Sequence, residues 1–156
     1  MPLRHFTHPG IAGKRLAPLA PSALLARGTG MRAALTWRLF VARVVFRSNR
    51  QHGDLAVEVP AGTTLLEASK DAHGAVGDAC GGNCACSTCH VYVISGQNLL
   101  SEMDDKESDR LDLGFDVRSS SRLACQARVE GDGEVVCEIT QESLEAFENE
   151  HPEHRQ

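Results

Sequence analysis

The first 53 residues of the 156-residue chain contain no aspartate and no glutamate. This part holds nine Lys and Arg residues, whereas residues 54–156 hold seven basic residues and all 21 acidic ones, so the formal charge of the second part is −14. Such a difference in charge indicates that the two parts have different roles. An Arg-rich segment that lacks acids and contains scattered Ser and Thr is typical of a mitochondrial transit peptide.

We therefore interpret residues 1–38 as a targeting presequence or a disordered extension, and we expect the mature protein in the mitochondrial matrix. Two alternatives stay open. In a bacterial gene the true start could be near Met31, which would place the protein in the bacterial cytoplasm. Residues 16–26 resemble the short apolar h-region of a secretory signal peptide. Two prolines interrupt this stretch and a basic pair precedes it, so secretion is the weakest interpretation.

Long apolar runs are also missing. No stretch of ~20 apolar residues occurs, so we expect no membrane-spanning helix. The acidic part would repel phosphates, which argues against nucleic-acid binding and favours a protein partner with a basic face.

Aromatic residues make up 4% of the chain, so aliphatic side chains must fill the core. We expect a monomer.

The patterning after residue 38 predicts two strands, a helix, an irregular cysteine-rich loop, a strand, an acidic helix and two final strands. Thr64 and Glu67 have the spacing of a capping box at the start of the first helix, and Gly74 fits its end. Ser101 is the expected cap of the acidic helix, which we place at Ser101–Leu113. The last two strands are expected to be joined by a turn at residues 131–133. This order predicts an α+β fold with a small mixed sheet and one packed helix.

We place the domain at residues 39–140 and an acidic C-terminal tail at residues 141–156. The tail, with one or two helical turns at most, is expected to be mobile.

Six cysteines are present, and four of them lie between residues 80 and 89. Disulfide scaffolds spread their cysteines along the chain, and structural zinc sites usually use two CxxC pairs, of which this sequence has one, Cys86–Cys89. An iron–sulfur cluster needs soft thiolates from a loop and a distant one to close the cage. The plant-type spacing fails because position 92 is Tyr, and the paired Cys/His boxes of a Rieske centre are absent. The spacing Cys80-x5-Cys86-x2-Cys89, followed by Cys125, is the one that works.

Three stretches, "GDACGGNCACSTCHVYV" from Gly77, "MDDKESDRLDL" from Met103 and "RLACQ" from Arg122, resemble the adrenodoxin-type [2Fe–2S] ferredoxins of vertebrates and bacteria. The resemblance implies a β-grasp fold with a long cluster-binding loop, one [2Fe–2S] cluster, and one-electron transfer rather than enzymatic catalysis. By position it implies four ligands: Cys80, Cys86, Cys89 and Cys125. The sequence departs from the family at Thr140, where many members have a proline, and this leaves the C-terminal packing undetermined.

The other residues of the loop have structural interpretations. Cys84 is expected to be a small buried residue under the loop, and Cys137 a core residue of a strand, because it alternates with Val135 and Ile139. Gly81 and Gly82 allow backbone N–H groups to approach the sulfur atoms. His90 is either a structural hydrogen-bonding residue, which we favour, or a redox-linked proton acceptor.

The acidic helix carries the candidate partner-binding residues Asp105, Glu107, Asp109 and Asp112. Three of them, at positions 105, 109 and 112, share one helical stripe. A run of charges is usually just a solvated face, but these residues match the helix with which the family docks its reductase.

The resemblance implies a flavoprotein NAD(P)H-dependent ferredoxin reductase as electron donor. It implies cytochrome P450-type monooxygenases or iron–sulfur cluster assembly proteins as acceptors. The alternative functions are a redox- or iron-sensing module and a zinc-stabilised protein-interaction module. A zinc protein would be colourless and an iron–sulfur protein brown.

Overall fold

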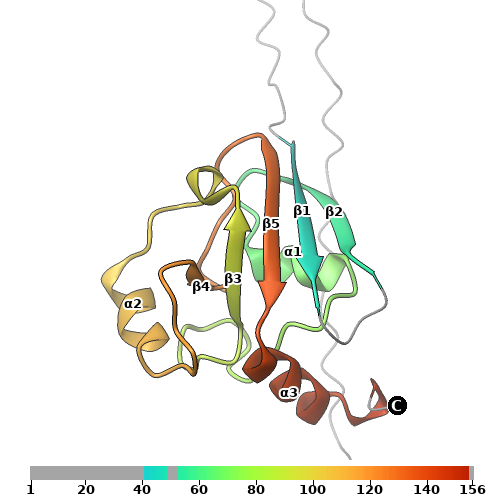
Figure 1. The fold of residues 1–156 in the computed structure, drawn as a ribbon, viewed down its shortest axis with the longest axis vertical. Helices are drawn as coiled ribbons and strands as arrows, with labels where there is room; N and C mark the ends of the chain where they lie inside the picture. The colour runs from blue at the N-terminus through green and yellow to red at the C-terminus, as the bar shows by residue number, and fades with distance from the viewer. Residues whose placement is uncertain (1–40, 49–52, 155–156) are drawn as a thin grey trace, which may run out of the picture. The chain divides into compact units, whose positions relative to one another are not determined.

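A mixed five-stranded sheet is the centre of the fold in the computed structural model, which describes residues 41–48 and 53–154 (Figure 1). The strand order is β2-β1-β5-β3-β4, in which β1 and β5 are parallel and the other neighbours are antiparallel. The strands are β1 Val41–Arg47, β2 Leu55–Pro60, β3 His90–Ser95, β4 Ser121–Leu123 and β5 Gly133–Ile139. The helices are α1 Leu65–Asp71, α2 Asp105–Leu111 and α3 Gln141–Glu150, with short 3-10 turns η1 Gln97–Leu99 and η2 Pro152–His154. This is the expected α+β class.

Strand β5 lies between β1 and β3 and supplies the middle of the core. Val135 and Cys137 are fully buried and Ile139 is 2% exposed, so the core position predicted for Cys137 is confirmed. Strand β2 alternates as predicted, with Ala56 and Glu58 exposed and Val59 buried. The expected hairpin loop between β1 and β2 falls largely outside the described residues, as does the predicted presequence at 1–38.

Helix α1 starts with the predicted capping box. The Glu67 N–H donates to Thr64 Oγ1 at 3.1 Å, and the Thr64 N–H donates to Glu67 Oε2 at 2.9 Å. Two further N–H groups of the first turn, which have no partner inside the helix, donate to carbonyls beyond β4: Leu65 N to Ala127 O and Leu66 N to Ala124 O, both at 2.9 Å. The start of α1 is thereby joined to the segment that contains Cys125.

The predicted hairpin between the last two strands is wrong. β4 pairs with β3, and β5 pairs with β1 and β3, so the two strands are not neighbours in the sheet. After Leu123 the chain turns out of the sheet, because the N–H groups of Gln126 and Ala127 both donate to Leu123 O. The strand-like pattern of residues 124–129 instead reflects burial against α1.

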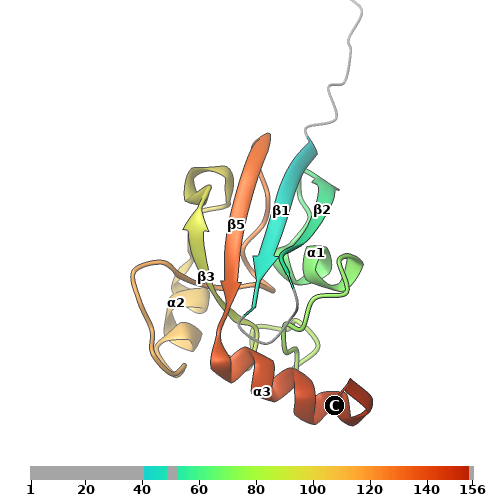
Figure 2. The same cartoon turned by 45° about the vertical axis from the view of Figure 1, so that its right-hand side comes forward.

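The segment expected to be a mobile acidic tail forms a ten-residue helix, α3, which directly follows β5. Thr140 is its N-cap, with Oγ1 accepting from the Ser143 N–H at 3.2 Å. Ser143 is fully buried and Leu144 is 3% exposed, so the helix packs onto the domain. Where many members of the resembled family have a proline, this chain thus has the helix cap Thr140. Figure 2 shows α3 below the end of β5.

The acidic helix is shorter than predicted, and its N-cap is Asp104 instead of Ser101. Asp104 Oδ1 accepts from the Glu107 N–H at 2.7 Å. Ser101 has another task, since its hydroxyl accepts from the Arg128 N–H at 3.1 Å. Across residues 41–48 and 53–154, no helix has the length and apolar character that crossing a membrane requires.

The capping box gives a stability prediction. We expect Thr64→Ala to lower the free energy of unfolding by about 1–2 kcal/mol, because the Glu67 N–H and carboxylate both lose a partner. For a domain of this size the melting temperature should fall by roughly 4–8 °C per kcal/mol, which thermal unfolding followed by circular dichroism measures. Thr63→Ala is the matched control: the carbonyl that accepts from Val129 N stays in place, so its effect should be within about 0.5 kcal/mol. Equal effects of both substitutions would contradict the role of the cap.

Candidate metal centre

Four of the six cysteines lie on the segment between α1 and β3. Residues 74–89 contain no helix and no strand, and three positions in this segment have left-handed backbone geometry: φ is 65° at Gly81, 82° at Gly82 and 55° at Cys84. A side chain at Gly82 would lie 3.8 Å from Cys125 Cβ. The loop therefore folds back against the segment after β4, so that Cys125 lies beside the loop.

The thiols approach one another in pairs. The Cys86 side chain lowers the pKa of Cys80, and Cys89 and Cys125 shift the pKa of each other. The first pair is partly exposed and the second is buried. Within the part of the chain that the structure describes, no three Cys, His, Asp or Glu side chains gather as the ligands of a single ion.

Hydrogen-bond donors point at these sulfur atoms. Burial raises the pKa of Cys80. The backbone N–H groups of Ala85, Asn83 and Cys86, together with the Cys86 side chain, lower it by more, so the net shift is downward. The donors directly follow the two left-handed glycines, in agreement with the role expected of those glycines.

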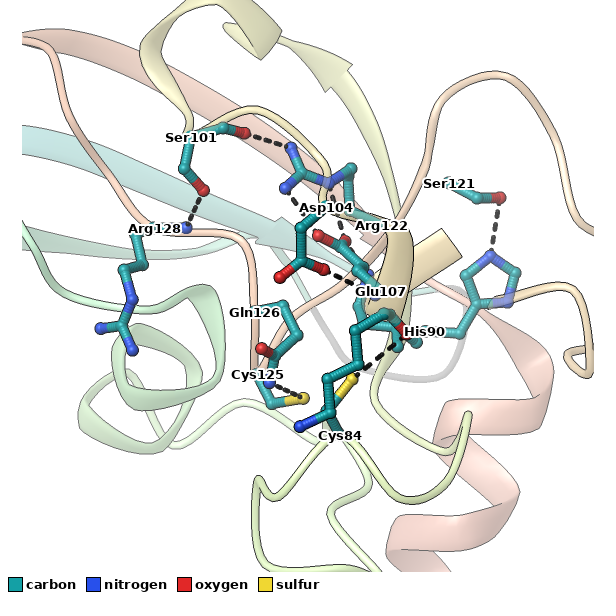
Figure 3. Close-up of polar contacts among 12 residues, drawn as sticks. Cys84, His90, Ser101, Asp104, Glu107, Ser121, Arg122, Cys125, Gln126 and Arg128 are labelled. Carbon is teal, nitrogen blue, oxygen red and sulfur yellow. Dashed lines mark hydrogen bonds and ion pairs between the residues drawn. The ribbon is translucent and has the colours of Figure 1, made fainter. Parts of the chain in front are cut away.

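Cys125 has a comparable set of donors. The hydrogen bond from Cys89 lowers the pKa of Cys125 to about 6, with further help from Gln126 and the Cys84 N–H. Gln126 Nε2 lies 3.2 Å from the Cys125 sulfur (Figure 3). The same pairing, together with burial, raises the pKa of Cys89. The pairing thus favours the thiolate form at Cys125 over that at Cys89.

The two remaining cysteines are buried. Burial raises the pKa of Cys137 to about 12, which keeps it a neutral core residue. Cys84 is 3% exposed, and its sulfur lies 3.7 Å from the Lys106 carbonyl oxygen. Burial is also the main cause that raises the pKa of Cys84. Both positions agree with the structural interpretation of these residues.

His90 joins the end of the loop to the sheet. It is fully buried, and its Nε2 lies 2.7 Å from Ser121 Oγ (Figure 3). The backbone N–H of His90 donates to Ser87 O at 3.1 Å, and its backbone carbonyl accepts from Thr140 Oγ1 at 2.9 Å. Burial lowers the pKa of His90. These contacts favour the structural role over that of a proton acceptor.

Glu107 differs from the expectation, because it is 1% exposed and lies under α2 instead of on its surface. Its carboxylate accepts from Arg122 Nε at 2.8 Å, Arg122 Nη2 at 2.9 Å and the Leu123 N–H at 2.9 Å (Figure 3). Arg122 also donates to Ser101 O at 2.8 Å. This network joins α2 to β4 just before Cys125. The signal in the sequence was the spacing of Glu107 and Leu111, which are four residues apart and form the buried face of the helix.

The other three acidic candidates are exposed on or next to α2, at positions 105, 109 and 112. Large apolar side chains that sequence reasoning missed lie just beyond them: Leu113 is 70% exposed and Phe115 is 77% exposed. The Tyr92 hydroxyl holds this segment to β3 by donating to the Asp116 carbonyl at 2.8 Å. The surface therefore combines negative charge with apolar area.

Comparison with known proteins places these features in a family. Residues 48–130 match the family model described as the 2Fe-2S iron-sulfur cluster binding domain. A 2Fe-2S ferredoxin of Haemophilus influenzae is 38% identical over 65% of this chain and 91% of its own length. Adrenodoxin-like protein 2 of Arabidopsis thaliana, a mitochondrial protein, is 43% identical. The matched part covers 51% of this chain and 43% of that relative.

Solved structures agree with the fold. The ISC-like [2Fe-2S] ferredoxin FdxB of Pseudomonas putida has a TM-score of 0.59 at 38% identity, covering 64% of this chain and 93% of its own. Reduced putidaredoxin from Pseudomonas putida, in a variant with one cysteine changed to serine, has a TM-score of 0.57 at 27% identity, covering 65% and 99%. The sheet described above is the β-grasp sheet of these proteins. The chain belongs to the [2Fe–2S] ferredoxin family, among its adrenodoxin-like and ISC-type members, and is an electron carrier with one [2Fe–2S] cluster rather than an enzyme.

Proposed function

We propose that this ferredoxin takes single electrons from a flavoprotein NAD(P)H-dependent reductase and passes them to P450-type monooxygenases or to proteins that assemble iron–sulfur clusters. The observation that carries the proposal is the position of an exposed acidic and apolar surface on α2 and the segment after it. The Glu107–Arg122 network joins that helix to the strand that ends just before Cys125. Docking and electron exchange are thereby brought to neighbouring parts of the domain.

The donor set fits the cofactor. Four thiols in two pairs provide two sulfur ligands for each of two irons, and soft thiolates are what such a cluster binds. We assign the pair Cys80 and Cys86 to one iron and the pair Cys89 and Cys125 to the other. The N–H groups that donate to these sulfurs also stabilise the added negative charge.

When bound, the cluster supplies a one-electron redox centre. The protein's own contribution is to hold the sulfurs, keep water from one side and leave the other accessible. Cys89 and Cys125 are buried, whereas Cys80 and Cys86 are partly exposed. Electron transfer needs a partner to come close to the cluster. We therefore assign the more exposed side, with Cys80 and Cys86, to electron exchange with partners.

For partner docking we retain Asp105, Asp109 and Asp112 and withdraw Glu107, whose carboxylate is saturated by buried partners. The charge of −14 after residue 53 steers a partner with a basic face. Phe115 and Leu113 add apolar area of the kind that stabilises the contact once it has formed. Putidaredoxin, to which this chain is 27% identical with a TM-score of 0.53, has been crystallised in a covalent complex with putidaredoxin reductase, and this supports a reductase as partner.

For the location we propose the mitochondrial matrix, with residues 1–38 as the presequence and the domain beginning at residue 39. Relatives occur both in mitochondria and in bacteria. A reporter fused to residues 1–53 should enter mitochondria and be shortened there, because its nine positive charges are not balanced by any acid. Fluorescence microscopy and an immunoblot measure both effects. A full-length reporter in the cytosol would contradict the proposal and favour the start near Met31.

The ligand assignment predicts the effect of single substitutions. Changing Cys80, Cys86, Cys89 or Cys125 to Ser should abolish or severely reduce cluster binding, because an oxygen ligand poorly replaces a soft thiolate. Cys84→Ser and Cys137→Ala should leave iron and sulfide per chain unchanged; Ala is preferred at 137 because a hydroxyl there would be buried in the core. The measurement is iron and acid-labile sulfide analysis. A cluster lost in Cys84→Ser but kept in Cys80→Ser would refute the assignment.

The docking surface predicts a change in affinity without a change in fold. Asp109→Asn combined with Asp112→Asn should raise the carrier concentration for half-maximal reductase turnover about tenfold at low salt. The difference should shrink as salt rises, since at ~0.15 M the Debye length is about 8 Å. The assay is reductase-driven reduction of cytochrome c in a salt series.

The matched control is Glu58→Gln combined with Asp71→Asn, which removes the same charge from exposed positions on β2 and α1. In Figure 1, β2 is the edge strand on the right and α1 lies behind β1 and β2, whereas α2 lies on the left beyond β3, so the control should behave like wild type. If both double variants change turnover equally, net charge alone matters and α2 is not the docking site.

A further inference from the structure

Helix α3 contacts the first residues of the cysteine loop, which is the irregular segment 74–89. The Gly77 N–H donates to Ser143 Oγ at 3.0 Å, and the Asp78 N–H donates to Glu150 Oε2 at 2.9 Å. The packing leaves no room between loop and helix, because a Cβ at Gly77 would lie 2.8 Å from Ala146 Cβ and 2.9 Å from Ser143 O. The chain is thus held by α3 two residues before Cys80.

The same helix contacts the last residues of the loop. Ser87 Oγ donates to Glu142 Oε1 at 3.1 Å, one residue after Cys86. Thr140 Oγ1, at the N-cap, donates to the carbonyl of His90 at 2.9 Å, one residue after Cys89. Figures 1 and 2 both show the loop beside α3. One short helix therefore holds the chain on both sides of the cysteines.

Glu142 also reaches the surface assigned to docking. Its second oxygen, Oε2, accepts from the Phe115 N–H at 2.9 Å. A single carboxylate thus connects Ser87 in the cysteine loop to the exposed apolar residue that follows α2.

The helix itself is well anchored. It continues directly from β5, the central strand, and Leu144 packs into the core at 3% exposure. Thr140 both caps the helix and bonds to His90. Because its own position is fixed by the core, α3 restrains the loop instead of following its motions.

We propose that α3 is part of the cluster site, with Ser143 and Glu142 as positioning residues that fix the two ends of the cysteine loop. The proposal rests on the ligand assignment above, since the loop carries Cys80, Cys86 and Cys89. A loop fixed at both ends holds its sulfur atoms and N–H donors in place before and after electron transfer, and it opens rarely enough to retain the cluster.

The test uses Ser143→Ala, Glu142→Ala and the control Glu145→Ala. Glu145 lies on the same helix and has the same charge, but its carboxylate accepts from Gln141 on the exposed side. Starting from the loaded protein, cluster loss to an iron chelator is followed by visible absorbance. For Ser143→Ala the rate should rise about tenfold, as expected when a buried donor loses its acceptor. Glu142→Ala should also lose the cluster faster, and Glu145→Ala should match wild type.

Two further measurements separate positioning from general destabilisation. Amide hydrogen exchange should rise at Gly77 and Asp78 in Ser143→Ala while the amides of β1 and β5 stay protected. The visible circular dichroism of the loaded protein, which reports the arrangement of the ligands, should change in Ser143→Ala and Glu142→Ala but not in Glu145→Ala.

Uniformly faster exchange across the sheet, or equal effects of Glu142→Ala and Glu145→Ala, would overturn the inference. The ligand assignment is judged separately. A wild-type protein without iron and sulfide would refute the assignment, whereas a loaded wild type with an unchanged Ser143→Ala variant would refute the role of α3 alone.

Discussion

In the ligand set that we propose, the sulfur of Cys125 has to be held opposite three cysteines of an irregular loop that ends 36 residues earlier, and the rest of the domain satisfies this constraint. On one side, β4 pairs with β3, so that His90 lies opposite Leu123. On the other, the first N–H groups of α1 donate to the carbonyls of Ala124 and Ala127. Cys125 thus lies between two rigid attachments, and its position does not depend on the flexibility of the loop.

The buried carboxylate of Glu107 adds a third attachment. Removing one partner of such a pair typically costs about 3–5 kcal/mol, because the other charge is left buried without compensation. Arg122 and Glu107 therefore hold α2 in one position relative to β4. This pair also fixes the position of the exposed acids of that helix, which we propose for docking. Two carboxylates on this short helix thus differ in surroundings, since Glu107 is buried in an ion pair and Asp109 is exposed.

Much of the site could be predicted from short-range patterns. The spacing of the cysteines, the capping box at Thr64 and the alternation around Cys137 are local rules, and the structure agrees with the last two in detail. The errors concern long-range pairing. The turn at residues 131–133 looked like a hairpin, but whether β5 pairs with β4 or with β1 depends on a partner more than eighty residues away. Similarly, the acidic composition of residues 141–150 concealed Ser143 and Leu144, whose burial is decided by the loop and core they meet.

The most direct test of the account is the cofactor content of the purified protein, measured together with electron paramagnetic resonance after reduction. Four thiols arranged as two pairs predict about two irons and two acid-labile sulfides per chain, and about one unpaired electron per chain in the reduced protein. Zinc without sulfide, or iron without sulfide and without a paramagnetic reduced state, would contradict the account.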